Sequence, residues 1–148
     1  MTASPSAERQ VAVAALMSRP LITIAPDADL RQARAMMQQH GVHHLLVEDR
    51  GRIVGLISDR DIAQRLPAGR DLVSSRRDEE IAHRRVLQVA AFDLVTVEAE
   101  ASVEVAAALL LDHGISALPV RDPAGEIVGI VTSRDLLRGL LACVLPTA

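Results

Sequence analysis

The sequence predicts an α/β (α+β) fold made of two β-α-β-β-α units related by a pseudo-twofold axis. The first observation behind this prediction is an internal repeat, because His40-Gly41 recurs as His113-Gly114, 73 positions later. The second is the motif at residues 51–61, which recurs at residues 125–135 with an offset of 74. The third is that short apolar runs bounded by Gly, Pro and Asp alternate with segments of helical period in both copies. One unit of this size is small for a stable core, so we expect the two copies to bury their sheets together.

In the first repeat, the pattern predicts strands at residues 21–24, 45–48 and 53–57. Asp29 is the expected N-cap of a helix, because its side chain can accept a hydrogen bond from a free backbone N–H. Gly41 is expected to end this helix in the left-handed conformation that glycine adopts without strain. A second helix is expected to begin at Ser58 or Asp59 and to run through residue 66.

The second repeat predicts the same order of elements. Strands are expected at residues 94–97, 118–121 and 127–131, and helices at residues 102–113 and 133–143. A charged stretch at residues 76–85 predicts a solvated helix between the repeats, because its arginines are matched by acidic residues. The expected organisation is therefore an N-terminal segment (1–12), repeat 1 (13–66), a linker with a charged helix (67–86) and repeat 2 (87–145).

The composition of the 148-residue chain narrows the classes of function. The net charge is −3, and the chain has one Phe and no Tyr or Trp, so neither a basic surface nor stacking platforms for nucleic acid are expected. No run of 18 apolar residues is present, so we expect no membrane span. Cys143 is the only cysteine, which excludes an intramolecular disulfide and favours a cytoplasmic location.

Two stretches carry a resemblance to a known family. Gly-Val-His-His-Leu-Leu-Val (41–47) followed by residues 51–62 resembles the motif of the cystathionine-β-synthase (CBS) domain. Gly-Ile-Ser-Ala-Leu-Pro-Val (114–120) followed by residues 125–136 resembles a second copy of it. The resemblance spans residues 13–141 and implies a CBS domain pair, or Bateman module, of the stand-alone bacterial type. It also implies a homodimer that senses adenine-containing ligands such as AMP, ATP, NAD or S-adenosylmethionine in clefts between the repeats.

The most distinctive polar pattern is Ser58-x-x-Asp61, repeated as Thr132-x-x-Asp135, where a strand gives way to a helix. A hydroxyl at this place can contact a phosphate, and the aspartate can accept hydrogen bonds from both hydroxyls of a ribose. The same pattern is also a simple helix cap, and the two interpretations are compatible. The resemblance favours nucleotide binding.

The neighbouring arginines extend this interpretation, because a guanidinium matches a phosphate with two parallel hydrogen bonds. The resemblance further implies that residues 115–117 face the Ser58 and Asp61 pair, and that residues 42–44 face the Thr132 and Asp135 pair. The complete set of expected ligand-binding residues is Ser58, Arg60, Asp61, Ile115, Ser116, Ala117, Pro119, Thr132, Arg134, Asp135, Val42, His43, His44, Thr23 and Thr96.

The function predicted from these observations is regulatory sensing of an adenine nucleotide by a homodimer. The dimer contact is expected on apolar helix faces, formed by Ala33, Met36, Met37, Ala106, Leu109 and Leu110. No catalytic or resident metal site and no required cofactor is expected, since no P-loop, glycine-rich dinucleotide motif or nucleophile elbow is present. Two alternatives stay open: a constitutive dimerisation module with degenerate clefts, and the regulatory half of an enzyme whose catalytic domain has been lost or is encoded separately.

Overall fold

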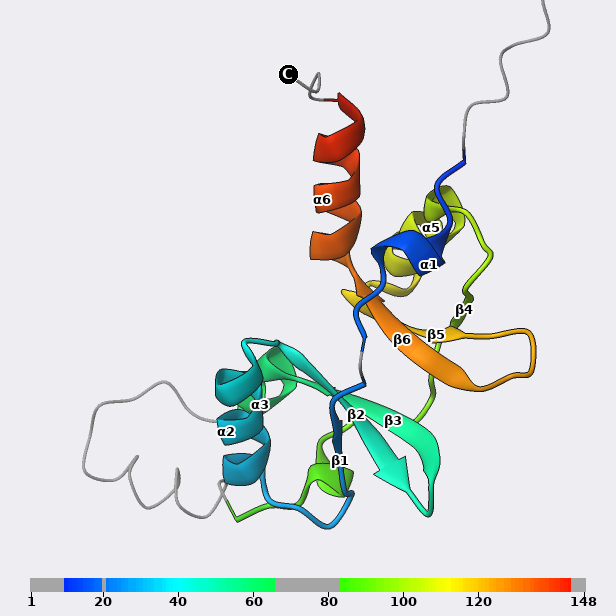
Figure 1. The fold of residues 1–148 in the computed structure, drawn as a ribbon. Coiled ribbons are helices and arrows are strands. Elements are labelled where there is room, and N and C mark those ends of the chain that lie inside the picture. The colour runs from blue at the N-terminus through cyan, green and yellow to red at the C-terminus, as the bar shows by residue number, and fades with distance from the viewer. Residues whose placement is uncertain (1–9, 20, 66–82, 145–148) are drawn as a thin grey trace, which may run out of the picture. The chain divides into compact units, whose positions relative to one another are not determined.

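The computed structural model describes residues 10–19, 21–65 and 83–144, which divide into two compact units (Figure 1). The described residues from Ile22 to Leu94 form the repeat-1 unit, and those before Ile22 join those from Val95 onward in the repeat-2 unit. The repeat-1 unit contains β1 (Thr23–Ile24), α2 (Leu30–His40), β2 (His44–Asp49), β3 (Arg52–Ser58), α3 (Asp59–Arg65) and the 3-10 helix η1 (Val86–Gln88). The repeat-2 unit contains α1 (Val13–Leu16), β4 (Val97–Glu98), α5 (Val103–His113), β5 (Ala117–Arg121), β6 (Ile127–Thr132) and α6 (Ser133–Val144). The predicted β-α-β-β-α order is confirmed in both repeats.

Each unit is built on a three-stranded mixed sheet. In the repeat-1 unit the order is β1-β2-β3, with β2 parallel to β1 and antiparallel to β3. The repeat-2 unit has the order β4-β5-β6 with the same directions. The middle strands β2 and β5 supply the most buried apolar residues, as expected of a central strand. Each sheet packs its apolar side chains with those of its own helices into a separate hydrophobic core.

The helix boundaries follow from the capping residues. The Asp29 side chain accepts a hydrogen bond from the backbone N–H of Gln32 at 2.8 Å, and Ser102 does the same for Val105 at 3.3 Å. Gly41 ends α2 with φ 63° and Gly114 ends α5 with φ 61°, in the left-handed region that favours glycine. The predicted caps of α2 are therefore confirmed, and repeat 2 uses the same device.

The outer strand of each sheet pairs at one position with a short lead-in segment, and this segment precedes the first strand of the other repeat. Ser18, which precedes β1, pairs with Ile130 of β6, and Ala91, which precedes β4, pairs with Leu56 of β3. The backbone bonds are 2.8 Å from Ser18 N to Ile130 O and 2.9 Å in both directions between Leu56 and Ala91. A glycine next to each pairing residue on the β-strand leaves room for this close approach.

The first strands of both repeats begin later than predicted, and β1 begins at Thr23 rather than residue 21. The first strand of repeat 2 differs more. It begins at Val97 rather than residue 94, so Thr96 lies outside the strand. In repeat 1 the backbone N–H of Leu46 donates to Ile22 O at 3.1 Å, which extends the parallel ladder. The position equivalent to Leu46 is Pro119, which has no N–H to donate. The ladder therefore starts one position later in repeat 2 than in repeat 1, and both predicted strands were too long at their beginning.

The predicted charged helix at residues 76–85 is wrong where it can be compared. Residues 83–85 form a turn, a bend and a bridge, and Leu30 N donates to Arg84 O at 3.0 Å. Arg85 pairs with Asp29 as an isolated bridge, which holds this segment against the start of α2. Charge spacing alone does not reveal such a tertiary contact. The rest of this helix, the predicted linker at 67–75 and the predicted end of the preceding helix at 66 lie outside the described residues, as do residues 1–9 of the N-terminal segment.

Most residues of the helix faces expected to form a dimer contact are buried. Ala33, Met37, Ala106 and Leu110 are buried in the core of their own units. Met36 and Leu109 are partly buried against the same cores. The helical period identified the faces that pack on the sheets, so this part of the prediction is wrong. The large apolar side chains that are exposed on described helices of the repeat-2 unit are Val105, Leu111, Leu137, Leu140 and Leu141.

Candidate functional site

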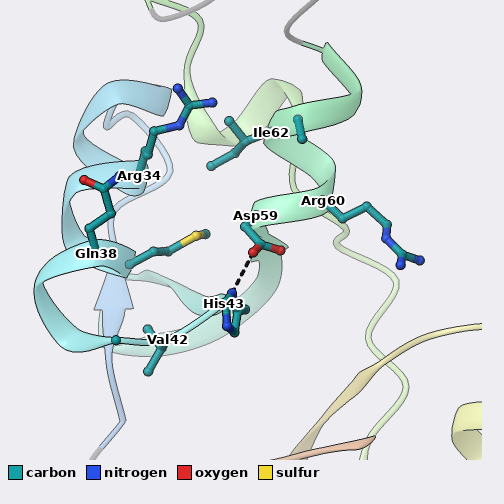
Figure 2. A pocket seen from close by; sticks show the side chains of 10 residues that line it. Arg34, Gln38, Val42, His43, Asp59, Arg60 and Ile62 are labelled. Carbon is teal, nitrogen blue, oxygen red and sulfur yellow. Dashed lines mark hydrogen bonds and ion pairs between the residues drawn. The ribbon is translucent and has the colours of Figure 1, made fainter. Parts of the chain in front are cut away.

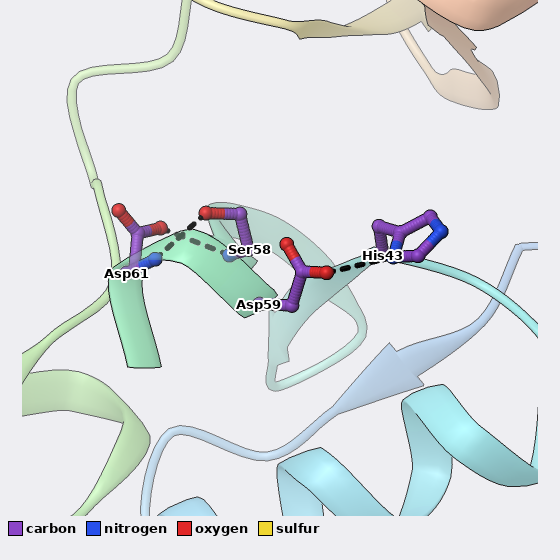
Figure 3. A network of polar contacts seen from close by, with 4 residues as sticks. All are labelled: His43, Ser58, Asp59 and Asp61. Carbon is purple, nitrogen blue, oxygen red and sulfur yellow. Dashed lines mark hydrogen bonds and ion pairs between the residues drawn. The ribbon is translucent and has the colours of Figure 1, made fainter. Parts of the chain in front are cut away.

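The end of β3 and the start of α3 hold Ser58 and Asp61 in a reciprocal arrangement (Figure 3). The backbone N–H of Ser58 donates to Asp61 Oδ2 at 2.9 Å, and the backbone N–H of Asp61 donates to Ser58 Oγ at 3.0 Å. Both residues are half-buried. The arrangement satisfies two backbone donors at the helix start, as a capping box does.

The junction of β6 and α6 repeats this arrangement with Thr132 and Asp135. Thr132 N donates to Asp135 Oδ2 at 2.9 Å, and Asp135 N donates to Thr132 Oγ1 at 3.2 Å. The Thr132 hydroxyl adds a third bond, to Asp135 Oδ2 at 3.0 Å. Asp135 is only 9% exposed, which makes it the one buried charged residue in the described part of the chain.

The two junctions leave different groups available to a ligand. In both aspartates Oδ2 is engaged, and within the described residues Oδ1 accepts no hydrogen bond. A carboxylate oxygen can accept two bonds, so each junction retains acceptor capacity in a fixed direction. The Thr132 hydroxyl donates its hydrogen bond to Asp135. The Ser58 hydroxyl accepts a hydrogen bond, and its own proton is available to another acceptor.

The segments before β2 and β5 lie beside the junctions of their own repeats. Asp59 N donates to His43 O at 2.9 Å, and Ser133 N donates to Ser116 O at 2.9 Å. His44 pairs with Ser58 in the sheet, and Ala117 pairs with Thr132. The structure therefore brings together predicted site residues from the same repeat. The pairing of residues across repeats, which the family resemblance implies, stays a prediction.

The other expected residues differ in accessibility. Ile115 and Ser116 are exposed, whereas Ala117 and Pro119 are buried in the repeat-2 unit. Thr23 lies on β1 in register with Leu46, and it is half-buried, as is Thr96. Arg60 and Arg134 are exposed and form no ion pair with the described part of the chain. Their guanidinium groups are therefore available to an anion.

A pocket of about 660 Å³ lies in the repeat-1 unit between α2 and α3 (Figure 2). Its walls are Arg34, Met37, Gln38, Gly41, Val42, His43, Asp59, Arg60, Ile62 and Ala63. At its edge His43 Nδ1 and Asp59 Oδ2 lie 2.7 Å apart, and both side chains are more than half exposed. Val42, His43 and Arg60 were among the expected site residues, but Ser58 and Asp61 do not line this pocket.

We did not predict from the sequence that α2 lines a pocket, because its residues were expected only to form a helix. A signal for it was present, because the repeats differ at the lining positions. Gln38 corresponds to Leu111, and Ala63 corresponds to Leu137. Small or polar residues therefore replace leucines where the pocket lies.

The described residues offer neither a metal centre nor a membrane span. Among the described residues, no group of three or more His, Cys, Asp or Glu side chains is arranged to hold a metal ion. In the same part of the chain, every helix is too short or too polar to cross a membrane.

Comparison with known proteins identifies the family. The sequence model of the CBS-domain family matches residues 13–68 and again residues 86–142. The chain belongs to the CBS-domain family. Its two matches make it a CBS domain pair, which confirms the resemblance seen in the sequence.

Relatives and solved structures agree with this assignment. The CBS domain-containing protein DDB_G0289609 of Dictyostelium discoideum is 31% identical over 141 residues, which is 93% of this chain and 96% of that protein. The CBS domain pair of protein MJ0100, solved in complex with 5′-methylthioadenosine and S-adenosyl-L-methionine, superimposes with a TM-score of 0.76 at 25% identity. That match covers 90% of this CBS pair and 98% of the MJ0100 chain. A putative signal-transduction protein with CBS domains from Burkholderia ambifaria gives a TM-score of 0.75 at 26% identity, covering 93% and 98%.

Some curated relatives are longer than this CBS pair. The chain spans 63% of one relative, from Methanopyrus kandleri, and 22% of the L-aspartate semialdehyde sulfurtransferase of Methanocaldococcus jannaschii. The same pair of repeats thus occurs in proteins of different size and activity. The match to the repeats therefore carries no information on a catalytic activity.

Proposed function

We propose that this CBS pair is a regulatory module that senses an adenine-containing ligand of the AMP, ATP, NAD or S-adenosylmethionine class. The observation that carries the proposal is the same hydroxyl–carboxylate junction in both units, with one aspartate oxygen held by the backbone and the other without a bond among the described residues. The solved CBS pair of MJ0100 in complex with two adenosine-containing molecules supports the same ligand class.

The geometry of the junction suits a ribose. Two neighbouring ribose hydroxyls are donors, and the carboxylates of Asp61 and Asp135 are acceptors already fixed in direction by backbone bonds. A fixed acceptor lowers the entropy lost on binding, because the side chain needs no further ordering. In repeat 1 the Ser58 hydroxyl and the Arg60 guanidinium are in addition free to meet a phosphate, and in repeat 2 Arg134 has this role.

The remaining expected residues belong to the same proposal. The exposed residues Ile115 and Ser116, together with buried Ala117, are proposed to contact the adenine. Residues 42–44 are proposed to do so for the other ligand, where two imidazoles leave less room for a base. We also propose that the module works as a homodimer and passes its ligand state to a protein partner.

One observation favours a second function, that of a dimerisation module without ligand. The reciprocal bonds of Ser58 with Asp61 and of Thr132 with Asp135 are complete as helix caps, and they need no ligand to explain them. Under this alternative the two aspartates stabilise the fold only. The two functions therefore differ in what happens when the charge of the aspartate is removed and its oxygen is kept.

The deciding experiment uses Asp61→Asn and Asp135→Asn, because asparagine keeps a side-chain oxygen that can still accept the capping bond. A thermal-shift panel of AMP, ATP, NAD and S-adenosylmethionine, with GMP as the control, selects the ligand. At 100 times the dissociation constant the ligand stabilises the fold by about 2.7 kcal/mol. Calorimetric titration is then expected to show about tenfold weaker binding per lost charged hydrogen bond. If no adenine compound raises the melting temperature, the ligand proposal fails and the dimerisation function remains.

A further inference from the structure

His43 and Asp59 form a side-chain pair that is separate from the helix cap beside it. His43 Nδ1 and Asp59 Oδ2 lie 2.7 Å apart, and both side chains are more than half exposed (Figure 3). The start of α3 is capped by the reciprocal bonds of Ser58 with Asp61, so the Asp59 carboxylate takes no part in the cap. A pair of charged groups this exposed contributes little to stability, and stability alone therefore does not account for it.

The second repeat shows that the fold does not require this pair. The equivalents of His43 and Asp59 are Ser116 and Ser133, at the same offsets of 73 and 74 that relate the rest of the repeats. The backbone bond between the two positions is kept, at 2.9 Å from Asp59 N to His43 O and at 2.9 Å from Ser133 N to Ser116 O. Repeat 1 therefore adds an imidazole–carboxylate contact to a backbone contact that both junctions share.

The carboxylate of Asp59 also has other cations within the same pocket. Arg34 and Arg60 line that pocket together with His43 and Asp59, but in the described part of the chain neither guanidinium forms an ion pair with Asp59. The carboxylate accepts from the imidazole instead, although a guanidinium carries more donors. Asp59 is therefore placed to act on His43.

The carboxylate determines which ring nitrogen of His43 carries the proton. An ionised carboxylate only accepts hydrogen bonds, so the proton of a neutral imidazole lies on Nδ1, between the ring and Asp59. Nε2 then has a lone pair and is a hydrogen-bond acceptor. Nε2 lies on the far side of the ring from Asp59, and the His43 side chain is 58% exposed. The pair therefore presents an acceptor with a fixed role on its exposed side.

We propose that Asp59 is a positioning residue that makes His43 the acceptor for the 6-amino group of a bound adenine. This inference rests on the proposed function, in which residues 42–44 contact the base of a ligand. A 6-amino group donates hydrogen bonds, whereas the 6-oxo group of hypoxanthine or guanine accepts them and meets the lone pair of Nε2. A site built for one hydrogen bond rejects the wrong group because its polar atom is left unpaired. His43 is then the residue that selects adenine over the 6-oxo purines.

Purine nucleotides that differ only at position 6 test the role of His43. The adenine compound selected by the thermal-shift panel is compared with its analogues. For AMP these are IMP, with an oxo group, and purine riboside 5′-monophosphate, with a hydrogen. Calorimetric titration is made at about pH 8, the upper end of the range in which an imidazole ordinarily changes charge. We expect about fivefold weaker binding for the hydrogen analogue, which loses one neutral hydrogen bond, and about tenfold or more for IMP.

Four variants separate the positioning role from a structural one. Asp59→Asn offers an amide N–H to Nδ1 and so allows the ring proton to move to Nε2, and the preference for AMP over IMP is expected to fall below about threefold. His43→Ser, which places the repeat-2 residue, is expected to have the same effect. Asp59→Glu keeps a carboxylate and is expected to keep most of the preference. The matched control is Asp49→Asn, which removes an equal charge from the exposed end of β2 and is expected to leave the preference unchanged.

Two results with a chain that binds AMP overturn the inference. One is an unchanged preference for AMP over IMP in Asp59→Asn, because the carboxylate then has no influence on the recognition of the base. The other is an equal loss of affinity for all three nucleotides, because Asp59 then acts on the whole ligand and not on position 6. A wild-type chain that binds no adenine compound is a different failure, in which the proposed function falls and takes this inference with it.

Discussion

Removal of the two capping aspartates is expected to destabilise the two repeats unequally. Asp61→Ala removes one acceptor, that of the Ser58 N–H, at a half-buried place. Asp135→Ala removes the acceptor of both the Thr132 N–H and the Thr132 hydroxyl, at a residue that is 9% exposed. A buried donor left without a partner costs its full desolvation, and an exposed one is solvated by water.

The magnitudes follow from this difference. Loss of a helix cap costs about 1 kcal/mol, which we expect for Asp61→Ala. Two donors lose a charged acceptor in Asp135→Ala, so we expect about 2–3 kcal/mol. For a chain of this length 1 kcal/mol corresponds to roughly 2–4 °C in melting temperature. The expected losses are therefore about 3 °C for Asp61→Ala and about 8 °C for Asp135→Ala.

Thermal unfolding followed by far-ultraviolet circular dichroism, without ligand, measures both values. The matched controls are Asp61→Asn and Asp135→Asn, which keep an acceptor oxygen and are expected to lose less than half as much. Equal losses for the two alanine variants, or a larger loss for Asp61→Ala, would refute the reasoning from burial and bond number. Such a result would mean that the third hydrogen bond and the burial of Asp135 add nothing to the free energy of unfolding.

Three further changes test the fold. Gly55→Ala places a Cβ 2.9 Å from the backbone oxygen of Ala91, so we expect it to lower the free energy of unfolding by about 1–3 kcal/mol, measured by denaturant titration; an unchanged midpoint would contradict the close approach. Arg50, with φ 51° in the turn between β2 and β3, is a strained non-glycine residue. Arg50→Gly is therefore expected to raise the free energy of unfolding by about 0.5–1 kcal/mol, measured by the same titration. Leu46→Pro removes the N–H that donates to Ile22 O and is expected to cost about 3 kcal/mol, whereas Leu46→Val keeps this bond and is expected to cost less than half as much.

The parts of the fold that the sequence predicts are those with local causes. Asp29 and Gly41 mark the ends of a helix because their side chains, or the lack of one, act on the adjacent backbone. The repeat itself supplied the order of elements in the second unit. The starts of β1 and β4 were both predicted too early, and β4 begins one position later than β1 because Pro119 cannot donate the ladder hydrogen bond that Leu46 donates. That information lies more than twenty residues away from the strand.

The candidate site divides in the same way. Ser58 and Asp61 are three residues apart, so their contact at a helix start could be predicted from spacing. The pocket could not, because its walls come from two helices, and periodicity distinguishes only the face that packs on the sheet from the rest. Met37 shows the limit: its spacing correctly marks an apolar helix face, but the same spacing was interpreted as a dimer surface.

The outer strand of each repeat pairs with the segment that precedes the first strand of the other repeat. Each sheet therefore depends on a segment from the other repeat. The outer strand β3 pairs with Ala91, which precedes β4, and the outer strand β6 pairs with Ser18, which precedes β1. An uncovered strand edge exposes unpaired N–H and C=O groups and invites association with other chains. Each CBS repeat is therefore completed by a segment that lies outside its own β-α-β-β-α unit. Ser58 and Thr132 are the last residues of β3 and β6, so each candidate junction follows a strand that is paired in this way.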